Sequence, residues 1–459
     1  MKTTLTLLAT AALLAACAGP EPRRATASEA AQAALPAPVF ASDAGSGPAA
    51  AALPWAQAFR GARLQRLIPL ALANNRDLRI AAFNIESARA TAAARDADLW
   101  PTVNAGLSGS RTPTAAGGIN SLYQAGLQVS AYELDVFGRL RGISAAAAAQ
   151  VLAAESSQYA VRTALVASVA NAEIALQADE ALLKLTRDTV ATREQSLQLM
   201  RQRFDAGVSG ELDLRAAESS LQVARAALAQ TQRQRVLDEN ALVLLIGGPL
   251  PADLPAPSGD LTDFEPLAEL PAGLPSEVLT RRPDIRQAEF TLAAADANID
   301  AARAAFWPRI TLTASAGTAS GHLSDLFKNS AWSFAPQLVQ PLFDAGRNRA
   351  NLAGARASRD VALAQYERAI QTAFREVADG LAGRATLAEQ RAALAAQVDA
   401  ESRRLSAAEQ RYGAGVSSAL DRLDAQRSLF AAQQTLVQVQ SQRAQNLVTL
   451  YRALGGGGA

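Results

Sequence analysis

A seven-residue stretch occurs twice in the chain, as Arg203-Phe204-Asp205-Ala206-Gly207-Val208-Ser209 and, 208 residues later, as Arg411-Tyr412-Gly413-Ala414-Gly415-Val416-Ser417. The glycine that both copies share, Gly207 and Gly415, suits the positive φ with which a helix ends. Ser209 and Ser417 suit the cap of a following helix. The stretch therefore predicts a tight turn between two helices, present twice in one chain of 459 residues.

Other landmarks repeat with nearly the same offset. The matched pairs are Trp100-Pro101 with Trp307-Pro308, Gly138-Arg139 with Gly346-Arg347, Leu212-Asp213 with Leu420-Asp421, and Gly247-Gly248 with Gly455-Gly456. An offset kept over separated landmarks indicates an internal duplication. We expect a first repeat at 61–250, a connector rich in proline and acidic residues at 251–275, a second repeat at 276–455 and a flexible tail at 456–459.

Each repeat is predicted to contain a short helix, two strands, a long helix and, after the turn, a shorter helix. In the first repeat the helices are expected at 75–99, 140–203 and 211–246. After each turn, leucines spaced by seven alternate with alanines, the pattern of a coiled-coil seam. These residues are Leu214, Ala217, Leu221, Ala224 and Leu228, then Ala425, Leu429, Ala432 and Leu436. A helix of about 64 residues spans roughly 95 Å, so the pattern predicts a rod and not a globular bundle.

The segments between the first two helices of each repeat alternate apolar and polar residues. Strands are expected near 102–111, 122–134, 309–318 and 331–343, each about as long as a tilted strand that crosses a bilayer. Trp100 and Trp307 would stand at the membrane interface, and Pro336 predicts a bulge or local bend. A soluble four-stranded sheet is the alternative. In lipid, the two open edges require further strands from other copies.

The N-terminus has the form of a lipoprotein signal peptide. Lys2 precedes an apolar core at 5–14, and Leu14-Ala15-Ala16-Cys17 is similar to the bacterial lipobox. We predict a signal peptide at 1–17, an acylated Cys17 and a lipidated tether at 18–60; an ordinary signal with an incidental cysteine is the alternative. Ala18 in place of aspartate favours the outer membrane, where three acyl chains would form a firm anchor.

Composition argues against several other classes of function. Lys+Arg 44 against Asp+Glu 43 gives a net charge of +1, which offers no argument for a nucleic-acid partner. One Cys, one His and two Met leave too few ligands for a zinc or copper site. The sole histidine, His322, stands in a glycine- and serine-containing stretch and is interpreted as a loop residue. No phosphate-binding loop is present, and we expect no enzyme activity, metal or cofactor beyond the lipid on Cys17.

Two further runs carry a family resemblance. Residues 274–285, LPSEVLTRRPDI, and residues 70–78, LALANNRDL, look like the two equatorial runs of the TolC-like outer membrane factors. Together with the lipobox and the duplication, they identify the chain as a member of the lipoprotein branch that works with resistance-nodulation-division pumps. The resemblance covers nearly the whole chain after the tether.

The resemblance implies a mainly helical fold with a small β part. Three copies would form a twelve-stranded transmembrane β-barrel, four strands from each chain, continued by a helical barrel across the periplasm. The function implied is conduction of small molecules from an inner-membrane transporter and a periplasmic adaptor to the exterior. The sequence leaves open whether drugs, metal ions or other cargo pass, and which adaptor and transporter take part.

The resemblance also assigns site residues. It places adaptor docking at the turns, on Gly207, Val208 and Ser209 and on Gly415, Val416 and Ser417. It places a periplasmic gate at Asp421 and Asp424, closed with the help of Tyr412 and Asp213. A basic residue that some members use in this gate is replaced here by Ser417.

Blander interpretations remain for these residues and for the whole chain. Asp421 and Asp213 would also stabilise helix N-termini through the helix dipole. A coiled-coil spacer lipoprotein shares the anchor and the rods but has no use for four alternating strands. A hydrolase based on carboxylates is a more distant alternative.

Overall fold

The computed structural model describes residues 26, 29, 53–115, 117–261, 264 and 282–456. The predicted signal peptide, Cys17, most of the tether and the final three residues lie outside the described residues, as do much of the connector and the first part of the run at 274–285. The elements are α3 Trp55–Ala58, α4 Ala62–Asn74, α5 Arg76–Ala97, β1 Val103–Pro113, β2 Ile119–Leu134, α6 Arg139–Asp205, α7 Glu211–Ile246, α9 Pro283–Ala304, β3 Arg309–Ser320, the 3-10 helix η3 Leu323–Asp325, β4 Ser330–Val339, α10 Arg347–Gly413 and α11 Ala419–Ala453.

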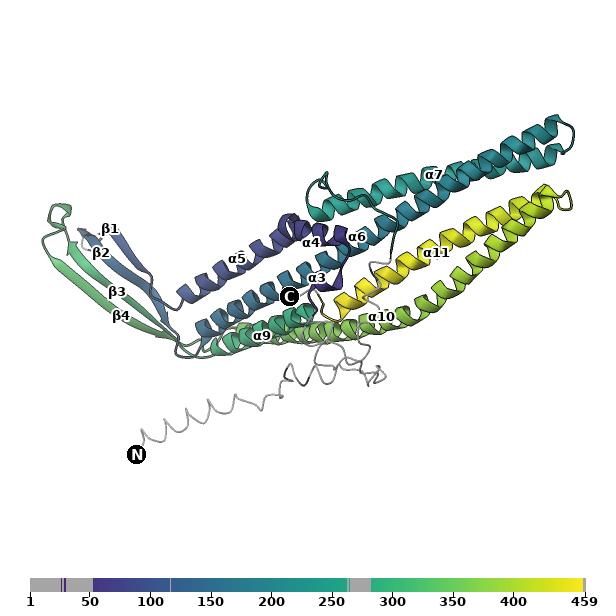
Figure 1. Cartoon of the computed structure of the whole chain (residues 1–459). Helices are drawn as coiled ribbons and strands as arrows, with labels where there is room; N and C mark the ends of the chain where they lie inside the picture. Colours follow the sequence, from purple (N-terminus) through teal and green to yellow (C-terminus); the bar gives the residue numbers. More distant parts are fainter. Residues whose placement is uncertain are drawn as a thin grey trace.

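The described elements form a rod with a sheet at one end and two helical turns at the other (Figure 1). The long helices α6 and α10 have 67 residues each, about 100 Å at the helical rise. Shorter helices flank them: α5 and α7 pack along α6, α11 packs along α10, and α9 packs against both α6 and α10. The rod and the mainly helical fold with a small sheet were both predicted. No helix among the described residues is long and apolar enough to cross a membrane.

Glycines with positive φ mark the duplication in the backbone. They occur as pairs at the predicted offset: Gly138 and Gly346, Gly207 and Gly415, Gly247 and Gly455. Gly207 and Gly415 have φ of 72° and 76°, as expected where a helix ends and the chain reverses.

Most buried apolar residues gather halfway along the rod, in a cluster that we call the central core. Here α4, α6, α10 and α11 meet, with residues such as Leu67, Ile174 and Leu450 fully buried. A much smaller cluster, the tip cluster, lies toward the turns and contains Leu197, Met200, Leu214, Ala217, Leu221, Tyr412 and Ala419. The rod is therefore held mainly at its middle.

The sheet is antiparallel in the order β1-β2-β3-β4, so β1 and β4 are its free edges within one chain. The register aligns polar residues on one face, for example Gln128 opposite Ser315, which is in turn opposite Ser333. The other face is apolar and exposed; Leu107 and Trp332 keep 71% and 81% of their surface accessible. The alternation predicted from the sequence is thus present as two chemically distinct faces.

Two details of the sheet were predicted wrongly. β4 ends at Val339 and not at 343, because Pro341 cannot donate to a ladder. The β3–β4 register runs unbroken through Pro336, and the irregularity lies instead in β2 between Val129 and Tyr132. A proline can leave a ladder intact on an edge strand when its nitrogen faces the open edge.

Candidate functional site

The turns 206–210 and 414–418, which we call the tips, lie together at the end of the rod far from the sheet (Figure 1). In each tip the amide of the valine returns to the preceding helix: Val208 N donates to Arg203 O (2.9 Å) and Val416 N donates to Arg411 O (3.0 Å). This helix-ending motif fixes the backbone and leaves the side chain outside. Both valines are 65% exposed, as a docking role requires.

A second exposed apolar pair was missed in the sequence. Leu212 and Leu420 stand in the first turns of α7 and α11 and are 83% and 65% exposed. They occupy equivalent positions of the two repeats. A leucine that is repeated in the first turn of both helices and lies outside the leucine and alanine seam could have identified them. Each tip therefore presents a valine and a leucine to solvent.

The serine caps predicted at Ser209 and Ser417 are wrong. Helix α7 begins after Gly210 without a side-chain cap, and α11 begins after Ser418. Ser418 forms a capping box with Asp421: the Asp421 amide donates to Ser418 Oγ (3.2 Å), and the Ser418 amide donates to the Asp421 carboxylate (3.1 Å). Asp421 thus does stabilise a helix start, while its side chain stays at the surface.

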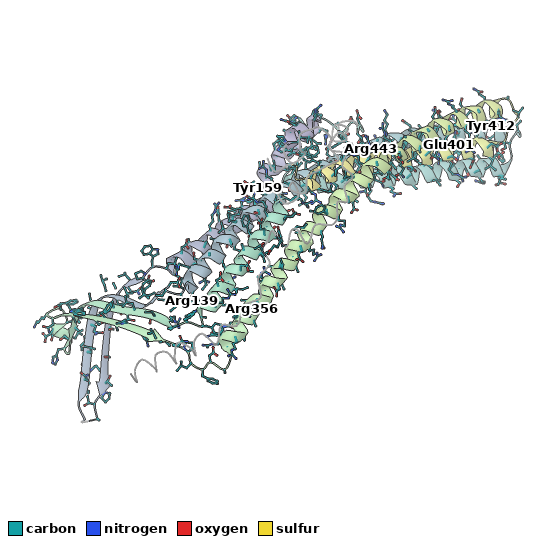
Figure 2. The ribbon with its side chains drawn as sticks, turned by 90° about the horizontal axis from the view of Figure 1, so that it is seen from below. Arg139, Tyr159, Arg356, Glu401, Tyr412 and Arg443 are labelled. Atoms are coloured by element: carbon teal, nitrogen blue, oxygen red, sulfur yellow. The ribbon has the colours of Figure 1, made fainter. Side chains whose placement is uncertain are left out.

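Asp424 lies between two arginines of its own chain. Arg404 of α10 donates to one carboxylate oxygen and Arg427 of α11 donates to the other, both at 2.6 Å. Arg404 also bonds to Glu401 (3.2 Å), which lies on α10 near the tip in Figure 2. The bonds from Arg404 and then Arg427 hold the pKa of Asp424 below its usual value. Within one chain, Asp424 is therefore ionised and largely neutralised.

Tyr412 is buried between the two helical hairpins, in the tip cluster (Figure 2). The guanidinium groups of Arg203 and Arg422 lie 4.9 and 4.6 Å from its ring centroid, a cation–π arrangement. Because the two arginines come from α6 and α11, the ring of Tyr412 connects the first hairpin to the second. Asp213 is half-buried nearby, in the first turn of α7. Its predicted role in the gate stays a prediction.

Several buried polar atoms of the tips and of the helices beside them have no hydrogen-bond partner among the described residues. They are Arg193 Nε, Ser209 Oγ, Ser417 Oγ, Arg422 Nε and Nη2, and Gln426 Oε1. Burial lowers the pKa of Arg193. Leaving such groups unpaired costs about 1–3 kcal/mol each. Arg193 and Arg422 are therefore buried with part of their hydrogen-bonding capacity unused within one chain.

At the opposite end, aromatic residues surround the junction of sheet and helices. Trp100 is 76% exposed, and Trp307 stacks on Phe137 with ring centroids 5.3 Å apart. Arg139, at the start of α6, forms two 2.8 Å bonds to Glu133 of β2. The ion pair fixes the long helix to the sheet. His322 is exposed in the β3–β4 connection, as expected.

The residues that the structure describes contain no group of three or more His, Cys, Asp or Glu side chains placed to hold a metal ion. The geometry is that of a scaffold with two distinct ends. One end offers an apolar sheet face with free edges, and the other offers exposed apolar tips beside a cluster of charges.

Comparisons with known proteins agree with this description. The family model described as outer membrane efflux protein matches residues 67–248 and 274–456, one stretch in each repeat. The chain is 46% identical over 418 residues to TtgC of Pseudomonas putida, a probable efflux pump outer membrane protein, covering 89% of this chain and 86% of TtgC.

Solved structures share the fold over nearly the full length. A membrane protein from Pseudomonas aeruginosa is 42% identical with a TM-score of 0.86, covering 95% of this chain and 99% of that one. The open state of the MtrE outer membrane channel of Neisseria gonorrhoeae is 39% identical with a TM-score of 0.84, covering 96% and 98%. By both its sequence and its fold, this chain belongs to the outer membrane efflux protein family.

Proposed function

We propose that three copies of this chain form the outer membrane channel of a tripartite efflux pump, which conducts small molecules from an inner-membrane transporter and a periplasmic adaptor to the exterior. The observation that carries the proposal is the sheet, whose apolar face is exposed and whose edges β1 and β4 are unpaired. In lipid, unpaired backbone groups cost several kcal/mol each. Pairing β4 of one copy with β1 of the next removes every edge once the ring closes.

Members of this family are efflux channels and not enzymes. A coiled-coil spacer has no use for a sheet with one apolar and one polar face, so the sheet also argues against that alternative. Purified in detergent, the protein should be a trimer that forms ion-conducting pores in planar bilayers. A monomer that retains its strands, or a trimer without conductance, would contradict the proposal.

We propose that the tips dock the adaptor through Val208, Val416, Leu212 and Leu420. Four exposed apolar side chains at equivalent positions of two repeats form a surface that a partner can bury. Val208→Asp with Val416→Asp should lower pump-dependent resistance while membrane level and trimer stay unchanged. Val223→Asp, a similar change at an exposed valine of α7 away from the tip, is the control. Wild-type resistance in the tip variant would exclude docking there.

We further propose that Cys17 is lipidated and holds the N-terminus at the outer membrane. The lipobox-like run and the position of the sole cysteine support this. Cys17→Ala should abolish labelling with radioactive palmitate and leave the precursor poorly processed. Continued labelling of that variant would show that the acyl group is elsewhere.

The gate is proposed at the second tip. By the family resemblance, Asp421 and Asp424 of three chains gather around the axis at the narrow end, where their carboxylates would favour cations. Asp421→Asn with Asp424→Asn should reduce cation selectivity and block by multivalent cations in single-channel recordings. If both properties survive, the charges that set them lie elsewhere.

A further inference from the structure

The tip of the second hairpin holds a chain of four alternating charges. Glu401 and Arg404 belong to α10, and Asp424 and Arg427 belong to α11. Consecutive members are joined by bonds of 3.2, 2.6 and 2.6 Å. The four charges sum to zero, so Asp424 adds little net negative charge at its level. Asp421 differs: among the described residues its carboxylate accepts only the Ser418 amide and pairs with no basic side chain.

The two arginines reach Asp424 in different ways. Arg427 is three residues further along the same helix and 78% exposed, a contact that side-chain motion breaks easily. Arg404 comes from the opposite helix of the hairpin and is only 48% exposed, and it is held at its other nitrogen by Glu401. Arg404 therefore fixes the position of its charge, while Arg427 completes the neutralisation.

We propose that Arg404 and Arg427 are selectivity-determining residues of the channel: by neutralising Asp424 they leave Asp421 as the main anionic residue at the narrow end and make the channel less cation-selective than its carboxylates alone would. The proposal rests on the proposed gate at the second tip. It concerns the cargo as well, because a weaker ring of negative charge repels anionic molecules less.

The first hairpin offers a matched control. There Glu218 of α7 lies between Arg201 of α6 (3.3 Å) and Arg215 of α7 (2.9 Å), so a carboxylate is again held by one arginine across the hairpin and one along its own helix. The two sites do not occupy equivalent positions of the repeats. Removing the arginines in either hairpin changes the net charge equally, and only the second hairpin carries Asp421 and Asp424, the carboxylates proposed to favour cations.

Single-channel reversal potentials in a salt gradient test the proposal on the full-length trimer. Arg404→Gln with Arg427→Gln should raise the cation-to-anion permeability ratio about twofold per exposed charge at low salt, and less at high salt. Arg201→Gln with Arg215→Gln should leave the ratio unchanged. A triple variant that adds Asp424→Asn to the first pair carries one negative charge more than the wild type, against two in the double variant, so its ratio should fall between those of the two.

The outcomes distinguish a failure of the proposed neutralisation of Asp424 from a failure of the proposed gate. If Asp421→Asn with Asp424→Asn changes the permeability ratio but Arg404→Gln with Arg427→Gln does not, the two arginines do not neutralise Asp424. The proposed gate then still stands. If neither pair changes it, the proposed gate itself is wrong. Equal shifts from both hairpins would mean that overall charge, and not this site, sets selectivity. Thermal unfolding of each variant shows whether the trimer stays folded.

Discussion

The central core and the tips both bury arginines, but they differ in how completely these arginines are hydrogen-bonded. In the central core, Arg63 forms bonds of 2.6 and 3.1 Å to Glu173 and also reaches the carbonyl of Pro255. Gln177 bonds to the same glutamate and accepts the amides of Ser258 and Gly259. At the tips, Arg422 is equally buried, yet its Nε and Nη2 have no hydrogen-bond partner among the described residues.

The difference indicates which part of the rod can open at a low cost in free energy. Separating the buried polar side chains of the central core breaks their hydrogen bonds. Water can replace these bonds only after the surrounding apolar residues have moved apart. Separating the tips exposes donors and acceptors that gain hydrogen bonds to water, and it uncovers a much smaller apolar cluster. We therefore expect local opening to concentrate at the tips, where the gate is proposed.

The largest expected effect comes from breaking the network in the central core. Glu173→Ala leaves Arg63 as an uncompensated buried charge and should destabilise the protein by about 3–5 kcal/mol. Thermal unfolding of the trimer measures the loss. Asp253→Ala is the control, because its pair with Arg66 lies at the surface and its removal should change little. Equal losses in both variants would contradict the central core as the rigid region.

A comparison of two buried arginines should give a smaller but more diagnostic effect. Arg282 donates to Ala453 O (3.0 Å), Asp284 and Glu376 (2.8 Å each), so Arg282→Met should cost about 2–4 kcal/mol. Arg422→Met loses the contact with Tyr412 but removes unpaired donors. It should change stability by less than about 1 kcal/mol.

Hydrogen exchange distinguishes the two arginine variants further. Arg422→Met should speed exchange near the tips only, whereas Arg282→Met should speed it around the central core. A loss of stability in Arg422→Met as large as that in Arg282→Met would mean that the tip is as firmly held as the middle.

The smallest expected effect depends on pH. Burial, followed by a hydrogen bond shared with Asp238, raises the pKa of Asp179 from 3.8 to about 7, although Arg235 opposes the shift. Because the folded state holds this proton while the unfolded state releases it above pH 3.8, stability should fall as pH rises from about 4 to 7. We expect about 1–2 kcal/mol over this range.

Asp179→Asn should remove this pH dependence, since an amide does not titrate. The second repeat has Leu387 and Asn446 at the equivalent positions, and Asn446 donates to Gly380 O (2.9 Å). Leu387→Ala should therefore lower stability equally at all pH values. A pH profile that persists in Asp179→Asn would assign the titration to another group.

Much of the fold followed from local patterns. The helix at 211–246 was predicted with its observed bounds, because Gly210 and Gly247 mark its ends. The strands followed from strict alternation. The irregularity in β2 did not, since Ala131 takes a φ of 52° with neither glycine nor proline to signal it. Its amide bonds to Thr313 of the neighbouring strand (3.2 Å), a contact set by tertiary pairing.

The candidate site residues likewise divide into those predictable from local sequence and those that depend on tertiary contacts. The exposure of Val208 and Val416 was predicted, because both stand in a repeated turn at a tip; their docking role stays a prediction. The neutralisation of Asp424 was not found, because Arg404 lies on another helix and their meeting depends on the rotation of α10 against α11. Tyr412 was assigned to the gate by resemblance, but its contacts with Arg203 and Arg422 required the packed hairpins.

The pairing of β2 with β3 also dictates an order of folding. Tyr123 lies opposite Ser320, and the whole first hairpin stands between them in the chain. Contacts between residues so distant in sequence form late, because closing a long loop costs entropy before the pairing compensates for it. Until the second repeat has been made, β1 and β2 form a lone hairpin with one apolar face and an open edge, the kind of structure that aggregates. We therefore expect the first strand pair to be most prone to aggregation during the interval in which only half of the sheet exists.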